Sequence, residues 1–363
     1  MSKPELASPN DVAFSKLDFK KTSNPDLHYY IDKGSLFSYA LKSKTSKKLY
    51  QQSSPISNLQ MGAVPGILYF RQNENLFQFN TNEGSVIQIT NFRKGKAEDK
   101  PADKESFLKS QQEELFQFIR DQEALKKWNL AKSKTIKSDF PKPYFYGKNN
   151  FGSLKVDPKG NFATFRLIED SERKNEKMEV FITADGYNQI EDTKAKVSTD
   201  NLLASKFGVY DIAKDSVYFV NFSSLSHIQD VPKYSELCEK SKTTEKKDKL
   251  IVVQEPIYNE NGSYAIAEIR SQDNKDRWIV SLNLKKGTFQ ELDHQHDEAW
   301  IGGPGIPSYS FGRGTLGFLG DNETVYFQSE ETGYSHLYTY NLKSKKKTQL
   351  TKGNWEVRNV NLS

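Results

Sequence analysis

The run LYTYNLKSKKKTQL, from Leu337 to Leu350, decides the fold. It reads as an aromatic and aliphatic strand, a tight polar turn and a second strand. Three further segments align with it without a gap: LFSYALKSKTSKKL from Leu36, LFQFNTNEGSVIQI from Leu76 and IVSLNLKKGTFQEL from Ile279. Each segment reads as a hairpin whose turn fixes its register. The chain therefore repeats one antiparallel unit.

Further apolar strands accompany these hairpins. GILYF from Gly66, YAIAEIR from Tyr264 and TVYFQS from Thr324 each precede a hairpin, and strands of the same kind stand alone at 161–167 and 216–222. The first two hairpins begin 40 residues apart. A period near 40 residues with several short antiparallel strands is typical of a β-propeller blade. We count about six such units in the sequence.

The predicted fold is all-β. Aromatic residues make up 12% of the chain, with 23 Phe and 18 Tyr, and this bias favours strands. A β-sandwich would also contain short strands, but it would not repeat the same hairpin at the same offset. We therefore expect a β-propeller of four-stranded antiparallel blades. Because 357–362 reads like the first strand of another blade, we expect an incomplete seven- or eight-bladed ring.

The predicted domain organisation is an N-terminal extension over 1–23 followed by blades over 24–363. A helical insertion at about 103–138 interrupts the blades, with apolar residues at three- and four-residue spacing. We interpret it as a helix that packs across the outside of its own blades, and a partner-binding helix is the alternative. Loop insertions at about 223–249 and 294–314 are further places for binding residues.

Charge and cysteine content narrow the class of partner. The net charge is +5, and the lysines are spread over the predicted turns, so we interpret them as solvated turn residues and expect no nucleic-acid partner. Cys238 is the single cysteine, which excludes an intrachain disulfide. No apolar run has the length of a membrane span, and the sequence opens without a signal peptide. We expect a soluble chain, periplasmic or cytoplasmic, that needs no cofactor.

Two acidic pairs are the candidate substrate-binding residues, Asp297 with Glu298 and Glu330 with Glu331. A carboxylate pair can receive the ammonium group of a peptide, because charge-assisted hydrogen bonds are strong. Acidic pairs on loops are also commonly just solvated, and that alternative stays open.

His294, His296 and Trp300 are the other loop candidates. The spacing of the two histidines places both imidazoles on one face of an extended strand. We interpret them as residues that order the loop by hydrogen bonds, and we predict no metal site because no third ligand stands at a diagnostic distance. Trp300, which precedes a Gly-Gly-Pro-Gly run, is expected to anchor the loop by packing.

The run QSEETGYSHLYTYNLKSKKKTQLTKGNWEV, 328–357, resembles the propeller of the prolyl oligopeptidase and dipeptidyl peptidase IV family of serine peptidases. The shared pattern includes the His-Leu-Tyr run at 336–338, Leu350-Thr351, and the Trp-Glu-Val run at 355–357. RSQDNKDRWIVSLNL, LDHQHDEAWIGGPG and the helical insertion followed by PKPYFYGK are similar to a bacterial branch of that family. The resemblance runs from about Asn24 onward.

The resemblance implies that an α/β-hydrolase domain, absent from this sequence, follows the propeller and carries the catalytic serine. No G-x-S-x-G elbow occurs here, so we expect no catalytic residue in this chain. Ser335 and His336 are adjacent, and their side chains would point to opposite faces of a strand. The Trp-aromatic-Glu-Glu motif of dipeptidyl peptidases is missing, which leaves dipeptidyl specificity open.

The expected function is that of a non-catalytic propeller that screens and positions peptide substrates for the hydrolase domain. The full-length parent would be a serine peptidase, and a homo-oligomer stays open. The alternative is a stand-alone propeller that binds a protein partner.

Overall fold

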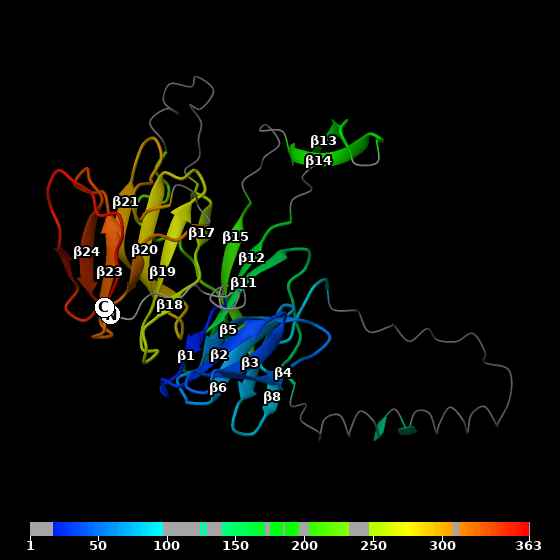
Figure 1. Ribbon diagram of the computed structural model, residues 1–363. Coiled ribbons are helices and arrows are strands. Elements are labelled where there is room, and N and C mark those ends of the chain that lie inside the picture. The colour runs from blue at the N-terminus through cyan, green and yellow to red at the C-terminus, as the bar shows by residue number, and fades with distance from the viewer. Residues whose placement is uncertain are drawn as a thin grey trace.

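The fold is all-β along nearly the whole of the described chain (Figure 1). The computed structural model describes residues 17–96, 124–125, 127–128, 140–170, 175–183, 186–195, 203–231, 247–307 and 312–362. These residues form five antiparallel sheets, of which four have four strands and one has five. Two small two-stranded pairs accompany them. The predicted propeller of four-stranded antiparallel blades is confirmed at the level of the blades.

The strands follow chain order within each sheet. The first sheet consists of β1 (Lys20–Lys21), β2 (Leu27–Asp32), β3 (Ser35–Ala40) and β4 (Thr45–Tyr50). The second consists of β5 (Ile56–Met61), β6 (Ile67–Gln72), β7 (Asn75–Asn80) and β8 (Ser85–Gln88). The third consists of β11 (Asn150–Val156), β12 (Phe162–Ile168), β15 (Ser205–Asp211) and β16 (Ser216–Phe219).

The last two sheets are built in the same way. The fourth consists of β17 (Ile251–Val253), β18 (Ile257–Tyr258), β19 (Ala265–Ser271), β20 (Asp276–Asn283) and β21 (Thr288–His296), with β17 and β18 both pairing with β19. The fifth consists of β22 (Leu316–Phe318), β23 (Thr324–Ser329), β24 (His336–Asn341) and β25 (Lys346–Gln349). The two small pairs are β9 (Phe92–Arg93) with β10 (Tyr144–Phe145), and β13 (Asn175–Val180) with β14 (Gln189–Ala195).

The repeated hairpin supplies the last two strands of a sheet, and its turn has one geometry in all five sheets. The fourth residue of each turn has a positive φ between 49° and 68°; these residues are Lys44, Gly84, Asp215, Gly287 and Lys345. In four of the sheets an Asn or Asp ends the preceding strand, and its side-chain oxygen accepts a hydrogen bond from a turn amide; these residues are Asn80, Asp211, Asn283 and Asn341. The residues of the turn therefore explain why the hairpin can be predicted from the sequence.

The blade count differs from the sequence prediction. The strands at 161–167 and 216–222 were expected to open separate units, but they contribute β12 and β16 to a single sheet. The β13–β14 hairpin stands between β12 and β15 in the sequence and projects away from that sheet (Figure 1). The described residues therefore contain five blades, and the count of about six was wrong.

The hydrophobic core is divided among the spaces between successive sheets. Each of the four interfaces has its own cluster of buried side chains, from the first sheet against the second to the fourth against the fifth. Fully buried members of these clusters are Leu36, Leu68, Phe165, Val209, Trp278, Ile279 and Phe327. A single twisted sheet cannot bury both of its faces, so each blade depends on its neighbours for stability.

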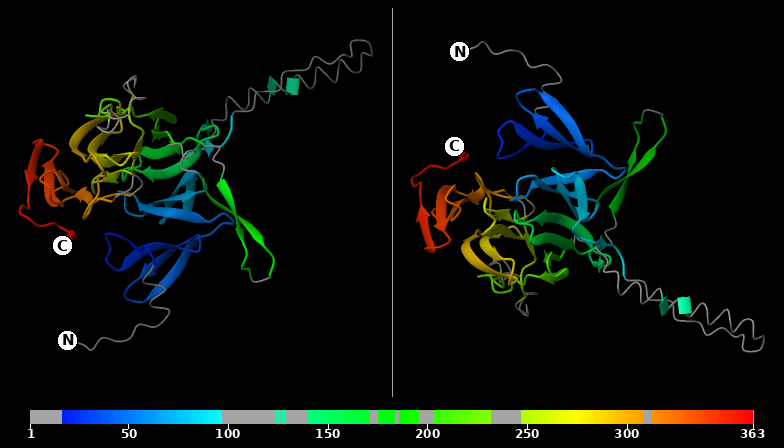
Figure 2. Two further views of the ribbon diagram at one scale, coloured as in Figure 1. Left: turned by 90° about the horizontal axis from the view of Figure 1, so that it is seen from above. Right: turned by 90° about the horizontal axis from the view of Figure 1, so that it is seen from below.

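The five sheets lie around an arc in chain order, from β1–β4 in blue to β22–β25 in orange and red (Figure 2). The opening strands of the second and third sheets, β5 and β11, are joined by hydrogen bonds. Asn58 of β5 donates a hydrogen bond to the carbonyl of Leu154 in β11 at 2.9 Å, and the amide of Val156 donates to Gln60 at 3.1 Å. These bonds fix where the second sheet meets the third.

The predicted insertions are described only in part. Ala124, Leu125, Lys127 and Trp128 are helical, and the rest of the helix predicted at about 103–138 lies outside the described residues. Residues 232–246 and 308–311, within the two loop insertions, also lie outside them. In the part of the chain that is described, no helix is long and apolar enough to cross a membrane.

Candidate functional site

The candidate residues gather at one end of the last two blades, where β21 ends and the loop to β22 begins. Asp297 orders this loop, because its Oδ1 accepts hydrogen bonds from the amides of Ala299 at 2.7 Å and Trp300 at 2.9 Å. Glu298 instead faces His296, with 3.3 Å between its Oε1 and the Nε2 of the imidazole. The two carboxylates of this predicted pair therefore have different surroundings.

The second acidic pair is also divided. Glu331 forms an ion pair with Lys347, which in turn contacts Asp293 of β21 at 2.6 Å. This bridge joins the fifth blade to the fourth.

Glu330 lies in a different environment, against the loop glycine Gly303. Burial raises the pKa of its carboxyl, and the nearby carboxylates of Glu356 and Asp297 raise it further, while Arg277 acts in the opposite direction. Asp297 and Glu330, one residue from each predicted pair, are therefore close enough to interact.

The two histidines of β21 contact one buried carboxylate. His294 Nε2 lies 3.0 Å and His296 Nδ1 lies 2.8 Å from Oδ1 of Asp276, whose side chain is fully buried. Lys249 forms an ion pair with the other oxygen of the same carboxylate. Asp276 and His296 are register partners in the β20–β21 pair, so the hairpin itself brings them together.

Asp276 is the electrostatic centre of this group. Burial would raise the pKa of its carboxyl, but hydrogen bonds from His294, Lys249 and His296 outweigh that effect and hold the pKa at about 2. The carboxylate is thus ionised throughout the neutral range. The ring of His294 stacks between Trp278 and His227, at centroid distances of 5.3 and 4.8 Å. This stack joins β21 to the loop that follows β16.

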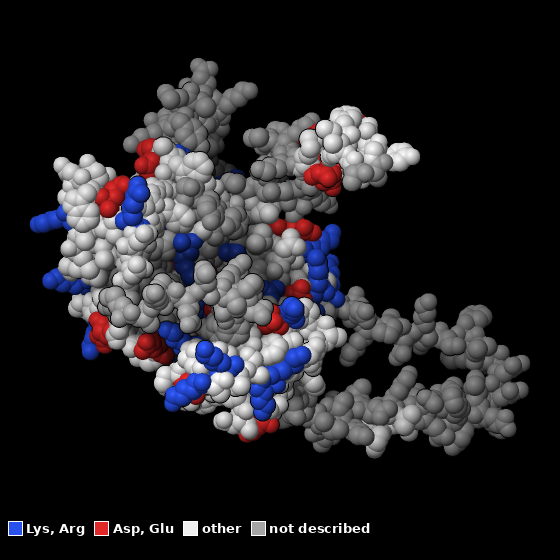
Figure 3. Space-filling view, in the orientation of Figure 1, with Lys and Arg blue, Asp and Glu red and all other residues white. Residues whose placement is uncertain are grey.

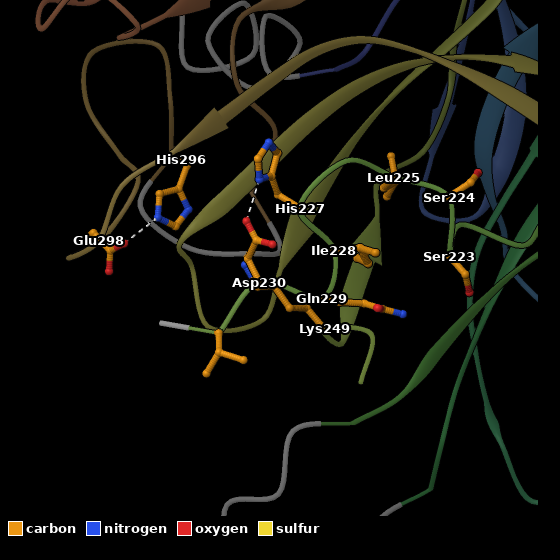
Figure 4. A pocket seen from close by; sticks show the side chains of 11 residues that line it. Ser223, Ser224, Leu225, His227, Ile228, Gln229, Asp230, Lys249, His296 and Glu298 are labelled. Atoms are coloured by element: carbon orange, nitrogen blue, oxygen red, sulfur yellow. Dashed lines mark hydrogen bonds and ion pairs between the residues drawn. The ribbon is translucent and has the colours of Figure 1, made fainter. Parts of the chain in front are cut away.

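A polar cavity of about 660 Å³ opens beside this cluster (Figure 4). Two histidine–carboxylate pairs line it: His227 with Asp230, 2.6 Å apart, and His296 with Glu298. Its wall therefore combines hydrogen-bond donors with acceptors, a mixture that suits a polar or zwitterionic ligand. Within the described ranges no three His, Cys, Asp or Glu side chains are grouped so that they could hold a metal ion.

Trp300 does not anchor its loop. Its side chain is 57% exposed, which corrects the expectation of a packed residue. The neighbouring Ile301 is the anchor: it is buried, its amide donates to the Asn274 carbonyl at 2.8 Å, and its carbonyl accepts from Arg270 at 3.0 Å. Asp297 already turns the chain at Trp300, so this indole points outward rather than into the blade interface.

Fully buried polar residues hold the Gly-Pro part of the same loop. Gln328 of β23 donates to the Pro304 carbonyl at 3.0 Å and accepts from Thr315 at 2.6 Å. Arg277 donates to the Gln328 carbonyl at 2.7 Å and to Glu268 at 3.1 Å. The hydrophilic strand residues of the fourth and fifth blades thus form a hydrogen-bond network inside the protein, which no pattern in the sequence predicts.

The family-like motif near the end of the sequence has a structural role. His336 is buried, with Nδ1 3.2 Å from the Thr351 hydroxyl and Nε2 3.0 Å from the Gly353 carbonyl. Its ring meets that of Trp355 edge to face at 5.2 Å. The histidine therefore ties β24 to the segment after β25.

Three residues of the site were missed from the sequence: Asp276, Lys249 and His227. Asp276 could have been found, because pairing the predicted strands of the Ile279 hairpin sets it opposite His296. Lys249 and His227 come from the polar insertion after β16, for which no periodic pattern exists.

Comparisons with known proteins agree with the architecture. Residues 216–363 match the family described as the dipeptidyl peptidase IV (DPP IV) N-terminal region. None of the curated proteins matches the sequence of this chain.

Two solved structures are similar in fold. One, a protein of Bacteroides ovatus described as a dipeptidyl aminopeptidase IV, is 13% identical, with a TM-score of 0.50 over 93% of this chain and 39% of that chain. The other, dipeptidyl peptidase 4 of Porphyromonas gingivalis, is 11% identical, with a TM-score of 0.52 over 94% of this chain and 38% of that chain. The chain thus spans about two fifths of the length of either structure. Residues 216–363 therefore match the family model of the dipeptidyl peptidase IV N-terminal region, and the described residues have the fold of β-propeller blades.

Proposed function

We propose that this chain is the non-catalytic propeller portion of a serine peptidase of the prolyl oligopeptidase and dipeptidyl peptidase type. In this role it screens peptide substrates and positions them for a hydrolase domain. The match of residues 216–363 to the DPP IV N-terminal region carries the proposal, and the likeness of fold over more than nine tenths of the chain supports it.

Glu330 is the residue that we assign to the amino terminus of the peptide. Its carboxyl is half-buried, and Glu356 and Asp297 make ionisation costly. A bound ammonium group would relieve this repulsion and favour the ionised carboxylate. An amino group is the end of the substrate that an aminopeptidase of this type must locate.

Binding by the chain itself tests this assignment. A short peptide with a free amino terminus should bind about tenfold more tightly than its acetylated form, measured by isothermal titration calorimetry, because one charge-assisted hydrogen bond is worth about 1.5–3 kcal/mol. Glu330→Gln should remove that preference. Glu323→Gln, an exposed carboxylate on the β22–β23 turn, is the matched control. Equal binding of the free and the acetylated peptide by the unaltered chain would count against the assignment.

A second experiment tests whether the catalytic residues lie outside this chain. The chain should not hydrolyse fluorogenic dipeptide amides, since it lacks a nucleophile elbow. The coding sequence beyond Ser363 should encode Gly-x-Ser-x-Gly, followed by Asp and His. Hydrolysis by the chain that a serine-directed inhibitor abolishes would contradict the proposal, and so would a stop codon after one further blade.

A second function, a propeller that binds a protein partner, is favoured by the β13–β14 hairpin. It projects from the third blade, and its apolar side chains are exposed, with Ile182 at 94%, Phe181 at 68% and Ile190 at 65%. Exposed apolar surface of this kind is common at protein interfaces. If the hairpin binds a protein, a second copy of the chain included, Ile182→Asp should abolish the association seen by sedimentation. Peptide binding should then be unaffected.

A further inference from the structure

The imidazole of His296 lies between two carboxylates. Its Nδ1 is 2.8 Å from Oδ1 of Asp276, and its Nε2 is 3.3 Å from Oε1 of Glu298. Asp276 is the first residue of β20, whereas Glu298 belongs to the loop that follows β21. The ring therefore joins a buried strand residue to a loop residue whose side chain lines the cavity of about 660 Å³ (Figure 4).

The number of protons on this ring decides which of the two contacts is a hydrogen bond. Asp276 is ionised and can only accept, because Lys249 and two imidazoles contact its buried carboxylate. A neutral imidazole has one N–H, and the short contact with Asp276 places it on Nδ1 of His296. The lone pair of Nε2 then faces an oxygen of Glu298, and two acceptors form no hydrogen bond. The imidazolium form, in contrast, donates to both carboxylates.

Further charged or titratable groups face this ring and its partners from the neighbouring elements. Among the described residues they are Lys249 ahead of β17, Lys275 in the β19–β20 turn, His294 on β21, Asp297 in the following loop, and His227 with Asp230 in the loop after β16. Each of these groups contacts an atom other than Nε2 of His296. The contact with Glu298 is therefore the one that depends on the second proton of His296.

The backbone of the loop that contains Glu298 is attached to the β19–β20 turn. The amide of Asp297 donates to the Lys275 carbonyl at 3.0 Å, and the amide of Ile301 donates to the Asn274 carbonyl at 2.8 Å. Between these two attachments, the side chain of Glu298 adds a contact with β21, the strand that the loop leaves. The state of the imidazole therefore affects how firmly the middle of this loop is held.

We propose that His296 is a pH-dependent latch: its imidazolium form fastens Glu298, and with it the middle of the 297–301 loop, to the fourth blade, and its neutral form does not. Histidine is the residue type that ordinarily changes charge between about pH 5.5 and about pH 8.5, and the chain has five. Lys, Arg, Asp and Glu, which are mixed over the face shown in Figure 3, ordinarily keep their charge in this range. Acidification therefore stiffens one wall of the cavity, whether or not the chain binds a peptide.

Nitrogen-15 NMR of the imidazole rings tests the first step. At about pH 8.5, where a histidine ring is ordinarily neutral, His296 should carry its proton on Nδ1. His294, whose Nε2 lies 3.0 Å from the same carboxylate oxygen, should carry its proton on Nε2 and serves as the internal control. A neutral His296 with its proton on Nε2 would overturn the inference, because that tautomer donates to Glu298 without a second proton.

Amide hydrogen exchange of the loop tests the second step. The amides of residues 299–301 are hydrogen-bonded, so their exchange, measured by mass spectrometry with labelling times scaled to the intrinsic rate, reports opening of the loop. Glu298→Ala should speed this exchange about two- to fivefold at about pH 5.5, as expected for a partly exposed ion pair, and should have no effect at about pH 8.5. Glu323→Ala is the matched control, because it removes a carboxylate that pairs with a lysine, Lys343, and it should leave the loop unchanged at either pH. Circular dichroism confirms that each variant is folded.

A variant of the histidine itself completes the test. In His296→Gln, which cannot gain a proton, Glu298→Ala should have the same effect at both pH values. An effect of Glu298→Ala in the unaltered background that is equal at the two pH values, or larger at the higher one, overturns the inference. An effect confined to the lower pH that persists in His296→Gln assigns the pH dependence to another histidine and overturns it as well. None of these measurements uses a peptide, so the assignment of Glu330 stands or falls separately.

Discussion

Asp276→Asn should destabilise the protein by about 2–4 kcal/mol at pH 7. The carboxylate is fully buried and accepts hydrogen bonds from Lys249, His294 and His296. Lowering its pKa from 3.8 to about 2 corresponds to about 2 kcal/mol of stability, since one pKa unit is worth about 1.4 kcal/mol. The upper end of the range includes the cost of leaving the ammonium group of Lys249, which is mostly buried, without its counter-charge.

The sign of the pH dependence follows from the lowered pKa. A carboxyl with a lower pKa in the folded state stabilises the protein fully above its unfolded value near 3.8, and the stabilisation is lost as the pH falls through about 2. About half of it should be gone at pH 3. The difference between the unaltered protein and Asp276→Asn should therefore narrow as the pH falls below 4.

Urea unfolding followed by circular dichroism measures both effects. Asp230→Asn is the matched control, because the same change removes a carboxylate that pairs with His227 at an exposed position, where such a pair contributes about 0–1 kcal/mol. The reasoning is refuted if Asp276→Asn costs less than about 1 kcal/mol, or if its cost is the same at pH 3 as at pH 5.

Three other changes test the blades themselves. Leu36→Ala, in the core between the first two blades, should cost about 2–5 kcal/mol in urea unfolding, and a loss below about 1 kcal/mol would contradict the packing. Lys345→Gly should raise stability by about 0.5–1 kcal/mol, because a left-handed φ of 57° suits glycine; a lower melting temperature would speak against that turn geometry. His336→Leu should cost about 1–3 kcal/mol and change the near-ultraviolet circular dichroism of Trp355, whereas an unchanged spectrum would show that the two rings do not meet.

The sequence predicts the blades well because the hairpin is a local structure. Each hairpin has its strand pattern and its four-residue turn within about fourteen consecutive residues, and the left-handed turn position carries Gly in two of the five sheets. The blade count failed where pairing is not local. β12 pairs with β15 across an inserted hairpin, so two strands of one sheet look like two separate units.

Only the site residues that lie on a strand were placed correctly from the sequence, because the alternation of side chains along a strand predicts their direction. Alternation along β21 placed His294 and His296 on one face, and both imidazoles reach the same carboxylate oxygen. Trp300 lies in the loop beyond the strand, where no period constrains the side chain, and there the expectation of burial failed. The separation of Glu330 from Glu331 likewise depends on Lys347 of β25, which only the β24–β25 pairing brings near.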